Sequence, residues 1–398
     1  MVGTGRSGAS IAEGPLWEEA LEQVLDGVRS TVPSSAPIDL ALLFANAAYA
    51  QDFEALVRRA RNETGATVLI GCSGAGVIGP SREIEGPPAL SLLGLSLPGA
   101  ELRGVRITQR DVQRWQEPAD WHVGLDVAPV DVNAWLLFVD PFRTDASELV
   151  ERLSAAYPGC PIIGGLASGN PHTRQTFVFL DDESYADGAV ALAIGGAYTV
   201  HTIVSQGAEP IGESWTITDA EENRVKSIGM RRALDVLLET LRSLPPDDQR
   251  RAQQNLLVGL AMDEHRDAYG RGDFLIRNLV GVDQSSGVLA VGAHPQVGQT
   301  IQFQLRDARA AHEELRHLLE QARETLIQRP PLAAVVCSCN GRGAGLFDSP
   351  DHDATAIAET LGLPSAAGFF CNGEIGPVGP RHYLHGFTAS IALIVPKP

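Results

Sequence analysis

The chain has 398 residues, 44% of them hydrophobic, so it can form substantial cores, and its length predicts two or three domains at about 100 to 200 residues each. Its 49 acidic and 31 basic residues give a formal net charge of -18, which disfavours binding to nucleic acid or to an anionic membrane. No apolar run reaches the roughly 18 to 20 residues of a membrane span, and the first residues lack a signal-peptide pattern. We therefore expect a cytoplasmic protein.

The cysteines are too few and too scattered for a disulfide framework, and their odd number leaves at least one thiol unpaired. Reduced thiols fit the cytoplasmic location. The five are Cys72, Cys160, Cys337, Cys339 and Cys371.

In chain order, the first fourteen residues are rich in glycine and serine, and we expect them to be frayed. Apolar residues then recur at helical spacing from Leu16 to Val28, behind Pro15. Residues 1–35 are therefore predicted to be a flexible start followed by a docked helix.

A unit of strand, helix, strand and glycine-rich turn then occurs three times, and a further apolar strand follows each turn. The continuous apolar pattern of these strands predicts that both of their faces are buried. The first strands cover residues 38–44, 132–139 and 332–339, the helices start near Asp52, Asp145 and Asp351, and the turns are CSGAGVIG, LASGN and CNGEIGPVG. The later strands lie near Leu90, Gly188 and Phe387.

Between the second and third copies the pattern changes. A charged, turn-rich passage places a domain boundary near Asn223, and residues 255–303 read as a meander of strands without a helix. Helices are predicted over residues 230–244 and 311–326, and a polar surface loop over residues 245–254. The fold class is therefore α/β (mixed α+β), with repeated β-α-β-β units forming two packed domains, residues 36–223 and 224–398, whose layered sheets have flanking helices.

The glycine-rich turns are the expected ligand sites, because ligands in open α/β sheets bind beyond the carboxyl ends of strands. Glycine also lets a backbone approach a ligand closely. The turn CSGAGVIG is only a partial nucleotide-binding pattern, and no P-loop lysine follows it. Nucleotide binding is therefore weakly supported, and tight turns at the helix–sheet junction explain the glycines equally well.

The third copy gathers the most polar side chains near its strand ends. An arginine there is suited to clamp a carboxylate and an acid to meet an ammonium group, which fits an amino acid or a similar zwitterion. The candidate ligand-binding residues are Asn340, Arg342, Asp351, His352, Asp353, Cys371, Asn372, Glu374, Arg381 and His385.

Several of these residues have other interpretations. Asp351 and Asp353 are at the positions of an N-cap residue and a first-turn acid, and capping is the favoured interpretation for both. Cys371 in a glycine-rich turn permits a nucleophile, with His385 or His382 as base and Glu374 as orienter, but the turn does not match the G-x-S-x-G pattern.

A metal site is a further alternative. Cys337 and Cys339 share a strand face, Cys371 ends the neighbouring strand, and His385 would complete a Cys₃His set. Buried cysteines are more often small hydrophobes, so no cofactor or metal is expected.

Two stretches, SCNGRGAGLFDSPDHDATAIAETLG and GFFCNGEIGPVGPRHYLHGFTASIALI, closely resemble the C-terminal half of FIST proteins. EPIGESWTIT, FLIRNLVGVDQSSGVLAVG, GCSGAGVIG and PIIGGLASG agree as well, so the resemblance spans about residues 36–396. The motif positions carried over are Asn340, Gly341, Arg342, Asp351, His352, Asp353, Gly373, Glu374, Gly376, Pro377, His385 and Gly386.

The resemblance implies an N-terminal and a C-terminal FIST domain in a signal-transduction sensor that binds small ligands such as amino acids and reports to a signalling partner protein. It implies no catalytic activity. We expect a non-catalytic sensor in which the turn at Glu374 binds a small polar ligand. The alternatives are a Cys-dependent acyl hydrolase or transferase using Cys371 with His385, and a structural protein-interaction module.

Overall fold

The computed structural model describes residues 5–33, 35–170, 173–264, 269–270 and 272–398. The chain forms two compact units, one of Met1–Val204 with Leu315–Pro398 and the other of Ser205–Glu314. Both mix strands and helices, which confirms the predicted fold class. Among the described helices, none is both long and apolar enough to cross a bilayer.

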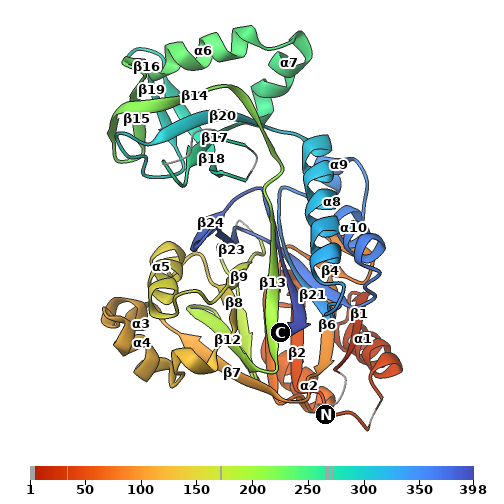
Figure 1. The fold of residues 1–398 in the computed structure, drawn as a ribbon. Coiled ribbons are helices and arrows are strands. Elements are labelled where there is room, and N and C mark those ends of the chain that lie inside the picture. Colours follow the sequence, from red (N-terminus) through yellow and green to blue (C-terminus); the bar gives the residue numbers. More distant parts are fainter. Residues whose placement is uncertain (1–4, 34, 171–172, 265–268, 271) are drawn as a thin grey trace. The chain divides into compact units, whose positions relative to one another are not determined.

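The first unit consists largely of three repeats of one topology (Figure 1). The first contains β1 (Arg6–Glu13), α1 (Trp17–Thr31), β2 (Leu40–Asn46), η1 (Ala47–Tyr49), α2 (Phe53–Thr64), β3 (Val68–Gly74), β4 (Gly76–Gly79), β5 (Arg82–Glu85) and β6 (Ala89–Ser96). The second contains β7 (Ala100–Ile107), α3 (Gln109–Arg114), α4 (Pro118–Leu125), η2 (Pro129–Asp131), β8 (Ala134–Val139), α5 (Ala146–Ala156), β9 (Ile162–Leu166), β10 (Val178–Leu180), β11 (Glu183–Tyr185) and β12 (Ala189–Gly196). The third contains β13 (Tyr198–Ser205), α8 (Ala308–Thr325), β21 (Ala333–Cys339), α9 (Ala344–Phe347), α10 (His352–Leu361), β22 (Ala366–Cys371), β23 (Glu374–Val378), β24 (Arg381–His385) and β25 (Ala389–Pro396).

Each repeat forms the centre of its own six-stranded sheet. The two strands joined by the central helix are parallel in all three repeats: β2 with β3, β8 with β9, and β21 with β22. The closing strands β6, β12 and β25 pair antiparallel with the first strand of their own repeat. These pairings confirm the repeated unit that the sequence predicts.

The hairpin of each repeat leaves its own sheet and extends the sheet of another repeat. Hairpin β4–β5 joins β22, hairpin β10–β11 joins β3, and hairpin β23–β24 joins β9. The exchange is therefore cyclic, because the first repeat extends the third, the second extends the first, and the third extends the second. Because of this exchange, the turns that follow β3, β9 and β22 lie close together, at the ends of neighbouring strands.

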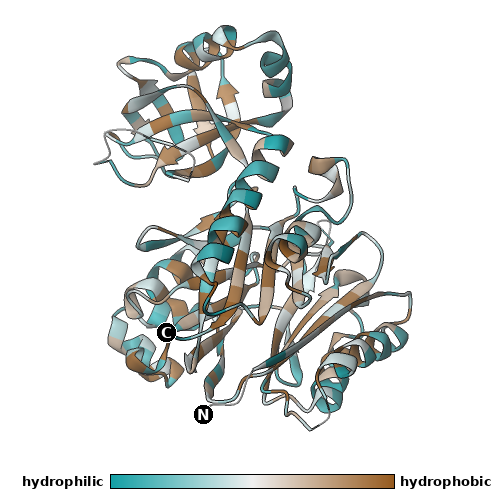
Figure 2. Cartoon of the chain, turned by 45° about the vertical axis from the view of Figure 1, so that its right-hand side comes forward, coloured by the Kyte–Doolittle hydropathy of each residue, from teal (hydrophilic) through white to brown (hydrophobic). Residues whose placement is uncertain are grey.

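The three sheets share a central apolar core. Phe44, Phe138 and Phe369 come one from each sheet, and their ring centroids lie 5.2 to 5.8 Å apart. Further clusters fill the space between each sheet and its helices. Figure 2 shows the same arrangement, with hydrophobic residues concentrated along the strands and polar residues frequent on the outer faces of the helices.

One glycine per repeat holds the parallel strands together. A Cβ atom on Gly71, Gly164 or Gly368 would lie 1.7 to 1.9 Å from the carbonyl oxygen of its register partner, Leu43, Leu137 or Val336 respectively. Only glycine permits this approach of two backbones. The three glycines therefore mark equivalent positions, from which other residues of the repeats can be aligned.

The N-terminal segment corrects one expectation. Arg6–Glu13 is not frayed but forms β1, which pairs along its whole length with β6. Small residues allow this, since a Cβ on Gly8 would lie 2.1 Å from the hydroxyl oxygen of Thr31 in α1. The predicted leading helix is α1. Residues 1–4 and 34 of the predicted segment lie outside the described residues.

The described part of the second unit contains a barrel-like sheet, two complete helices and the first turns of α8. Its strands are ordered β14-β20-β17-β18-β19-β15-β16, with an additional pairing of β14 with β15. The elements are β14 (Ala208–Glu221), β15 (Arg224–Ile228), β16 (Arg231–Arg232), α6 (Ala233–Ser243), α7 (Pro246–Asn255), β17 (Leu256–Ala261), β18 (Phe274–Asp283), β19 (Val288–Val291) and β20 (Thr300–Arg306). The predicted meander is thus present, although part of it lies outside the described residues.

One feature of this unit differs from the expectation. Residues 245–254 are predicted as a surface loop, but residues 246–255 form α7, whose first turn has a proline and two acids and which buries Ala252. Asn223, near which the sequence predicts a domain boundary, lies in the turn between β14 and β15, and its carbonyl oxygen accepts a hydrogen bond from Val291 N. The two compact units divide near residues 204 and 314.

Candidate functional site

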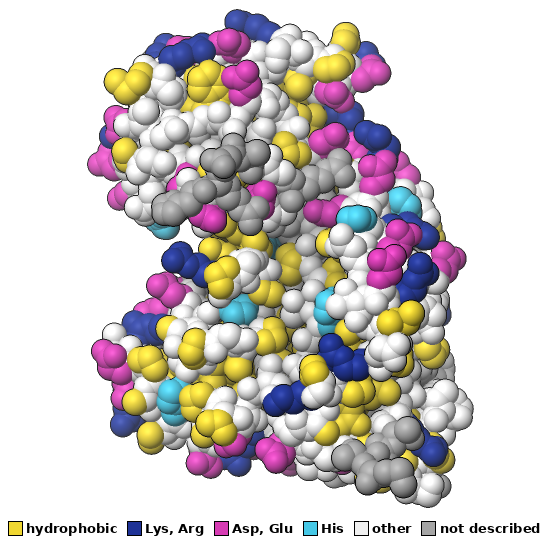
Figure 3. Space-filling view, in the orientation of Figure 1, with side chains coloured by type: hydrophobic (Ala, Val, Ile, Leu, Met, Phe, Trp, Pro, Cys, Tyr) yellow, Lys and Arg dark blue, Asp and Glu magenta, His cyan; other side chains and the backbone are white. Residues whose placement is uncertain are grey.

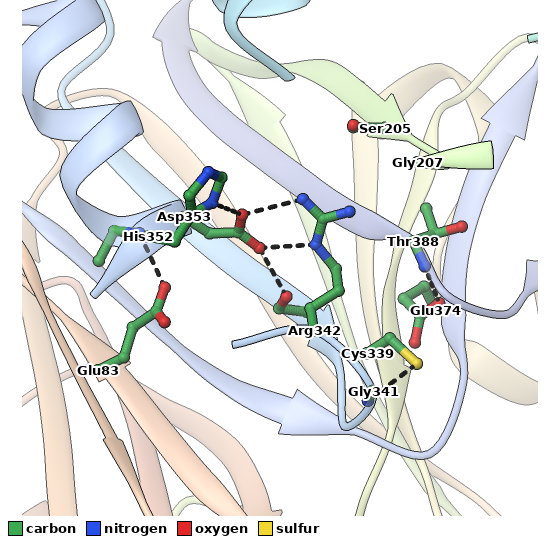
Figure 4. Close-up of polar contacts among 12 residues, drawn as sticks. Glu83, Ser205, Gly207, Cys339, Gly341, Arg342, His352, Asp353, Glu374 and Thr388 are labelled. Atoms are coloured by element: carbon green, nitrogen blue, oxygen red, sulfur yellow. Dashed lines mark hydrogen bonds and ion pairs between the residues drawn. The ribbon is translucent and has the colours of Figure 1, made fainter. Parts of the chain in front are cut away.

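A buried ion pair lies between the end of β21 and the start of α10. Arg342 Nε and Nη2 donate to the two carboxylate oxygens of Asp353 at 2.8 and 2.9 Å, and both side chains are almost fully buried. Ser338 Oγ also donates to Asp353 at 2.8 Å, and His352 Nδ1 lies 2.9 Å from its other oxygen. Figure 4 shows Arg342 and His352 beside the carboxylate of Asp353.

The structure separates the two acids of the capping interpretation. Burial opposes ionisation of Asp353, yet the Arg342 guanidinium and the His352 hydrogen bond hold the pKa of its carboxyl below its usual range. Asp353 lies in the first turn of α10, as predicted, and its carboxylate is thus the charged partner of Arg342. Asp351 makes no side-chain cap, has φ of 63°, and instead accepts a hydrogen bond from Glu83 N at 2.6 Å.

Glu83, on β5, reaches the same cluster from another repeat. One carboxylate oxygen accepts from Ala354 N at 2.9 Å, at the start of α10, and the other has no hydrogen-bond partner among the described residues. Burial, together with the nearby charge of Asp353, raises the pKa of Glu83 to about 8. The sequence argument missed Glu83, although two glutamates in the short strand Arg82–Glu85 are a detectable signal.

Glu374 forms a second buried polar cluster with two cysteines. Its oxygens accept from Cys371 Sγ at 3.2 Å and from Thr388 N at 2.9 Å, and Cys339 also hydrogen-bonds to its carboxyl group. In Figure 4, Glu374, Thr388 and Cys339 lie on one side of the Arg342 side chain, and Asp353 lies on the other. Arg342 thus stands between two buried carboxyl groups.

The ionisation of this cluster is governed by burial. Loss of solvation raises the pKa of Glu374 to about 8, although Thr388 N, Cys371 and the Arg342 charge oppose the rise. Burial likewise raises the pKa of the Cys371 thiol, and so does the nearby Glu374 carboxylate. A protonated thiol and a weakly acidic carboxyl group are therefore favoured at neutral pH.

Comparison of the repeats shows that Glu374 is not a requirement of the fold. In each sheet, the residue directly after the repeated glycine pairs with a residue of the exchanged hairpin. Phe369 pairs with Val77, Cys72 with Val178, and Gly165 with Glu374. Val77 and Val178 are fully buried valines. A carboxyl group at the equivalent buried position in the third repeat is costly unless its hydrogen bonds are satisfied, which indicates a specific role.

The other sequence-predicted residues are divided between the interior and the surface. His385 is buried, with Nε2 3.1 Å from Gly376 O. Arg381 is exposed on β24. Asn340 and Asn372, both exposed, follow Cys339 and Cys371 directly, and Asn340 Nδ2 donates to Asn372 Oδ1 at 2.9 Å.

A cavity of about 420 Å³ opens at the carboxyl ends of β8, β9 and β22. Asn372 is the sequence-predicted site residue in its wall, while Arg342, Asp353 and Glu374 are not among the lining residues. The guanidinium carbon of Arg174 lies 5.3 Å from the Phe142 ring centroid, so a cation and an aromatic face occur together. The described lining residues are Pro141, Phe142, Gly169, Asn170, Arg174 and Asn372.

Sequence reasoning did not find the second repeat's contribution to this cavity. Phe142 and Arg174 lie in loops whose proximity to Asn372 depends on the exchanged hairpins. In the described part of the chain, no group of three or more His, Cys, Asp or Glu side chains has an arrangement suited to a metal ion. The proposed Cys₃His set is therefore not assembled among these residues.

The visible face of the molecule carries acidic and basic side chains interspersed with apolar ones (Figure 3). The formal charge of -18 is thus spread over many positions rather than concentrated in one stretch. A solvated surface is the simplest account of this acidity.

Comparison with known proteins identifies relatives along the whole chain. An uncharacterised protein of Mycobacterium tuberculosis is 34% identical over 390 residues, which cover 98% of this chain and 100% of the relative. A protein of Mycobacterium bovis, also uncharacterised, is 34% identical over 390 residues and is covered to 99%. Both relatives span almost the same length as this chain.

Two solved structures of cyanuric acid hydrolases, one of them from A. caulinodans, align over 99% of this chain and 100% of theirs. Their sequence identities are 10% and 8%, and their TM-scores are 0.31 and 0.36. Scores this low establish neither a shared fold nor a shared reaction.

Two family models match the chain. The FIST N domain matches residues 39–231, and the FIST C domain matches residues 233–377, so the two matches meet at β16. Together they cover most of the sequence, in agreement with the motifs at Asn340–Arg342 and Asn372–Pro377. The chain therefore belongs to the FIST family, whose domains are sensor-type domains of signal-transduction proteins.

Proposed function

We propose that this protein is a non-catalytic sensor that binds a small carboxylate, with amino acids as the first class to test, in the cavity lined by Arg174 and Asn372. The observation that carries the proposal is the position of this 420 Å³ cavity at the carboxyl ends of β8, β9 and β22. Its size is within the range of small-molecule sites, about 300 to 1,000 Å³.

The wall of the cavity combines the groups that such a ligand needs. Arg174 supplies a guanidinium, which binds carboxylates in a bidentate manner, while Pro141 and Phe142 supply apolar surface. Asn372 is held in place, because its side chain accepts from Asn340 and donates to Ala167 O at 3.1 Å. A fixed amide beside a cation favours recognition of one ligand orientation.

Binding rather than turnover is supported by the state of Cys371. This side chain is fully buried, and its thiol is committed to Ser338 O and Glu374 at 3.2 Å each. Burial raises its pKa, so the thiolate that a nucleophile needs is disfavoured. His385 would be the base in the alternative hypothesis of a Cys-dependent enzyme, but its Nε2 is directed to Gly376 O.

The proposal is tested by calorimetric titration with a panel of amino acids, other small carboxylates and matched amines. We expect a carboxylate to bind the wild type, and Arg174→Gln to weaken binding at least tenfold without changing the melting temperature. Arg381→Gln, at an exposed arginine outside the cavity lining, is the matched control and should bind like the wild type. Equal loss in both variants, or none in Arg174→Gln, contradicts the proposed site.

The signalling partner protein is the second part of the proposal. We expect the partner to respond to occupancy of the cavity. Pull-down from a bacterial lysate with and without the bound carboxylate, using Arg174→Gln as a control, tests this dependence. Partner capture that ignores both the ligand and the substitution would favour the structural interaction module instead.

A further inference from the structure

Two cysteines stand at equivalent ends of neighbouring parallel strands in the third repeat. Cys339 ends β21, Cys371 ends β22, and the two are register partners. Neighbouring strands lie about 4.8 Å apart, which is within the roughly 4.4 to 6.8 Å range of Cα separations found in disulfides. The backbone therefore holds these residues at a spacing that a disulfide can bridge.

The other repeats show that this dithiol is a special feature of the third. Counting from the equivalent glycines and their register partners, the pair corresponds to Asn46 with Gly74 and to Asp140 with Ala167. Neither of the other repeats has a sulfur atom at these positions. The fold thus forms without cysteines at these two strand ends.

The same repeat adds a hydrogen-bond acceptor for both thiols. The Glu374 carboxyl group receives hydrogen bonds from Cys371 and Cys339, at a position where the other repeats have Val77 and Val178. Three substitutions relative to the other repeats therefore converge on one cluster. Packing of the core alone does not explain why the carboxyl group and the two thiols occur together.

The two thiols differ in accessibility. Cys371 is fully buried, whereas Cys339 is partly exposed, and Gly341 N donates to its sulfur at 3.5 Å. A backbone N–H directed at sulfur stabilises the thiolate, and a carboxylate beside the thiol can take its proton. Cys339 is suited to react first, and Cys371 is suited to act second from the interior.

We propose that Cys339 and Cys371 form a peroxide-sensitive dithiol, oxidised to a disulfide with Glu374 as a positioning residue. When Glu374 is ionised, Cys339 passes its proton to the carboxylate, and the Cys339 sulfur attacks one oxygen of a hydroperoxide, breaking the O–O bond. The departing oxygen takes the proton, giving water or an alcohol and a sulfenic acid on Cys339. Cys371 sulfur then displaces the sulfenic oxygen, which leaves as water with the Cys371 proton.

The overall reaction consumes two thiols and one hydroperoxide and gives one disulfide and, for hydrogen peroxide, two waters. It needs no other reductant or oxidant. Because Asn340 and Asn372 follow the two cysteines directly, the new bond would form beside the side chain that lines the cavity. The modification site is nevertheless independent of whether a carboxylate binds there.

The experiment treats the full-length protein with hydrogen peroxide, blocks the remaining thiols with N-ethylmaleimide, and maps the cysteine peptides by mass spectrometry. We expect a Cys339–Cys371 disulfide, still present in Cys337→Ala and absent in Cys339→Ser. In Cys371→Ser, dimedone should trap a sulfenic acid on Cys339. Cys160 is the internal control, since it is also partly exposed but hydrogen-bonds to Val132 O.

Glu374→Val tests the role of the acid with a residue that the other repeats already carry at this position. We expect oxidation of Cys339 to slow at least tenfold while Cys160 keeps its rate, and circular dichroism to show the native spectrum. Glu374→Gln serves as a second variant if the valine protein does not fold. Oxidation of Cys160 as fast as Cys339, or no disulfide in the wild type, overturns the proposal.

Discussion

Glu374 occupies, in the third repeat, the buried position that Val77 occupies in the first. The shared backbone therefore accepts an apolar side chain there, and the carboxyl group adds a polar, ionisable group that folding must hold in the interior. Its effects on stability and its effects on reactivity can be separated by experiment, because the fold does not need it.

The first prediction concerns the dependence of stability on pH. Burial raises the pKa of Glu374 from its ordinary value of 4.5 to about 8. Since the folded state binds this proton more tightly than the unfolded state, its contribution is full below about pH 4.5 and is lost as pH rises through about 8. Glu374→Gln cannot titrate, so its melting temperature should fall less than that of the wild type between pH 5.5 and pH 8.5.

Glu83 titrates over the same window, because its pKa is also raised to about 8, and it remains in both proteins. The comparison between wild type and Glu374→Gln therefore isolates one group. Parallel melting curves for the two proteins across this pH range would refute the buried, protonated state of Glu374. The groups whose ionisation bears on Glu374 are Arg342, Cys337, Cys339 and Cys371, and its register partner is His385.

The second prediction concerns the buried ion pair. Arg342→Ala leaves the Asp353 carboxylate without its bidentate partner in the interior, and should lower the free energy of unfolding by about 3 to 5 kcal/mol. Urea denaturation measures the change. Arg58→Ala, which breaks an exposed pair with Glu54, is the control and should cost less than about 1 kcal/mol. Similar losses in the two variants would show that the Arg342 pair is not desolvated.

The third prediction concerns one hydroxyl group between the strand ends. Ser168 N donates to Ser73 O and Asn372 N donates to Leu166 O, each at 3.1 Å, so the second repeat bonds to the first and the third bonds to the second. The equivalent contact from Ala75 to Phe370 is made through Ser168 Oγ, which accepts from Ala75 N at 2.7 Å and donates to Phe370 O.

Ser168→Ala therefore leaves two backbone groups of different repeats without this partner in the interior. We expect a loss of about 1 to 3 kcal/mol in the free energy of unfolding, measured by urea denaturation. Ser30→Ala, at an exposed hydroxyl in α1, should change the value by less than about 0.5 kcal/mol. An unchanged stability in Ser168→Ala would mean that the repeats do not depend on this bridge.

The fourth prediction concerns the repeated glycine. Gly164→Ala places a methyl group 1.8 Å from Leu137 O, a contact that only movement of the parallel strands can relieve. We expect mostly insoluble protein, or a melting temperature more than about 10 °C lower, by differential scanning fluorimetry. Gly345→Ala has open space around the new methyl and should fold normally. A stable Gly164→Ala protein would contradict the close strand approach.

The repeat itself was predictable because apolar strands and amphipathic helices have a strong periodicity, and the three copies have nearly equal lengths. The exchange of hairpins was not, because pairing between distant strands is determined by tertiary contacts. This is why the sequence grouped Arg342 with Glu374 from the third repeat but missed Glu83 from the first. Arg174 was missed for the same reason, since the cavity joins loops of two repeats.

Local signals also failed in particular places. Asp351 has the residue type of a helix cap, but its backbone adopts φ of 63° and its carboxylate turns to Glu83 N. The stretch Pro245–Gln254 is polar throughout, and its helix is defined by Pro246, first-turn acids and the buried Ala252 rather than by an apolar stripe. For Asp351 a contact with a distant residue outweighed the local pattern, whereas for α7 the local start signals outweighed the lack of an apolar stripe.

The central claim is that a small carboxylate binds between Arg174 and Asn372. A crystal structure of the protein with the carboxylate that binds most tightly in the calorimetric panel tests it most directly. The account predicts ligand density in the 420 Å³ cavity, with the carboxylate on the Arg174 guanidinium. Density for the ligand at Arg381 or elsewhere, with this cavity empty, would contradict the account.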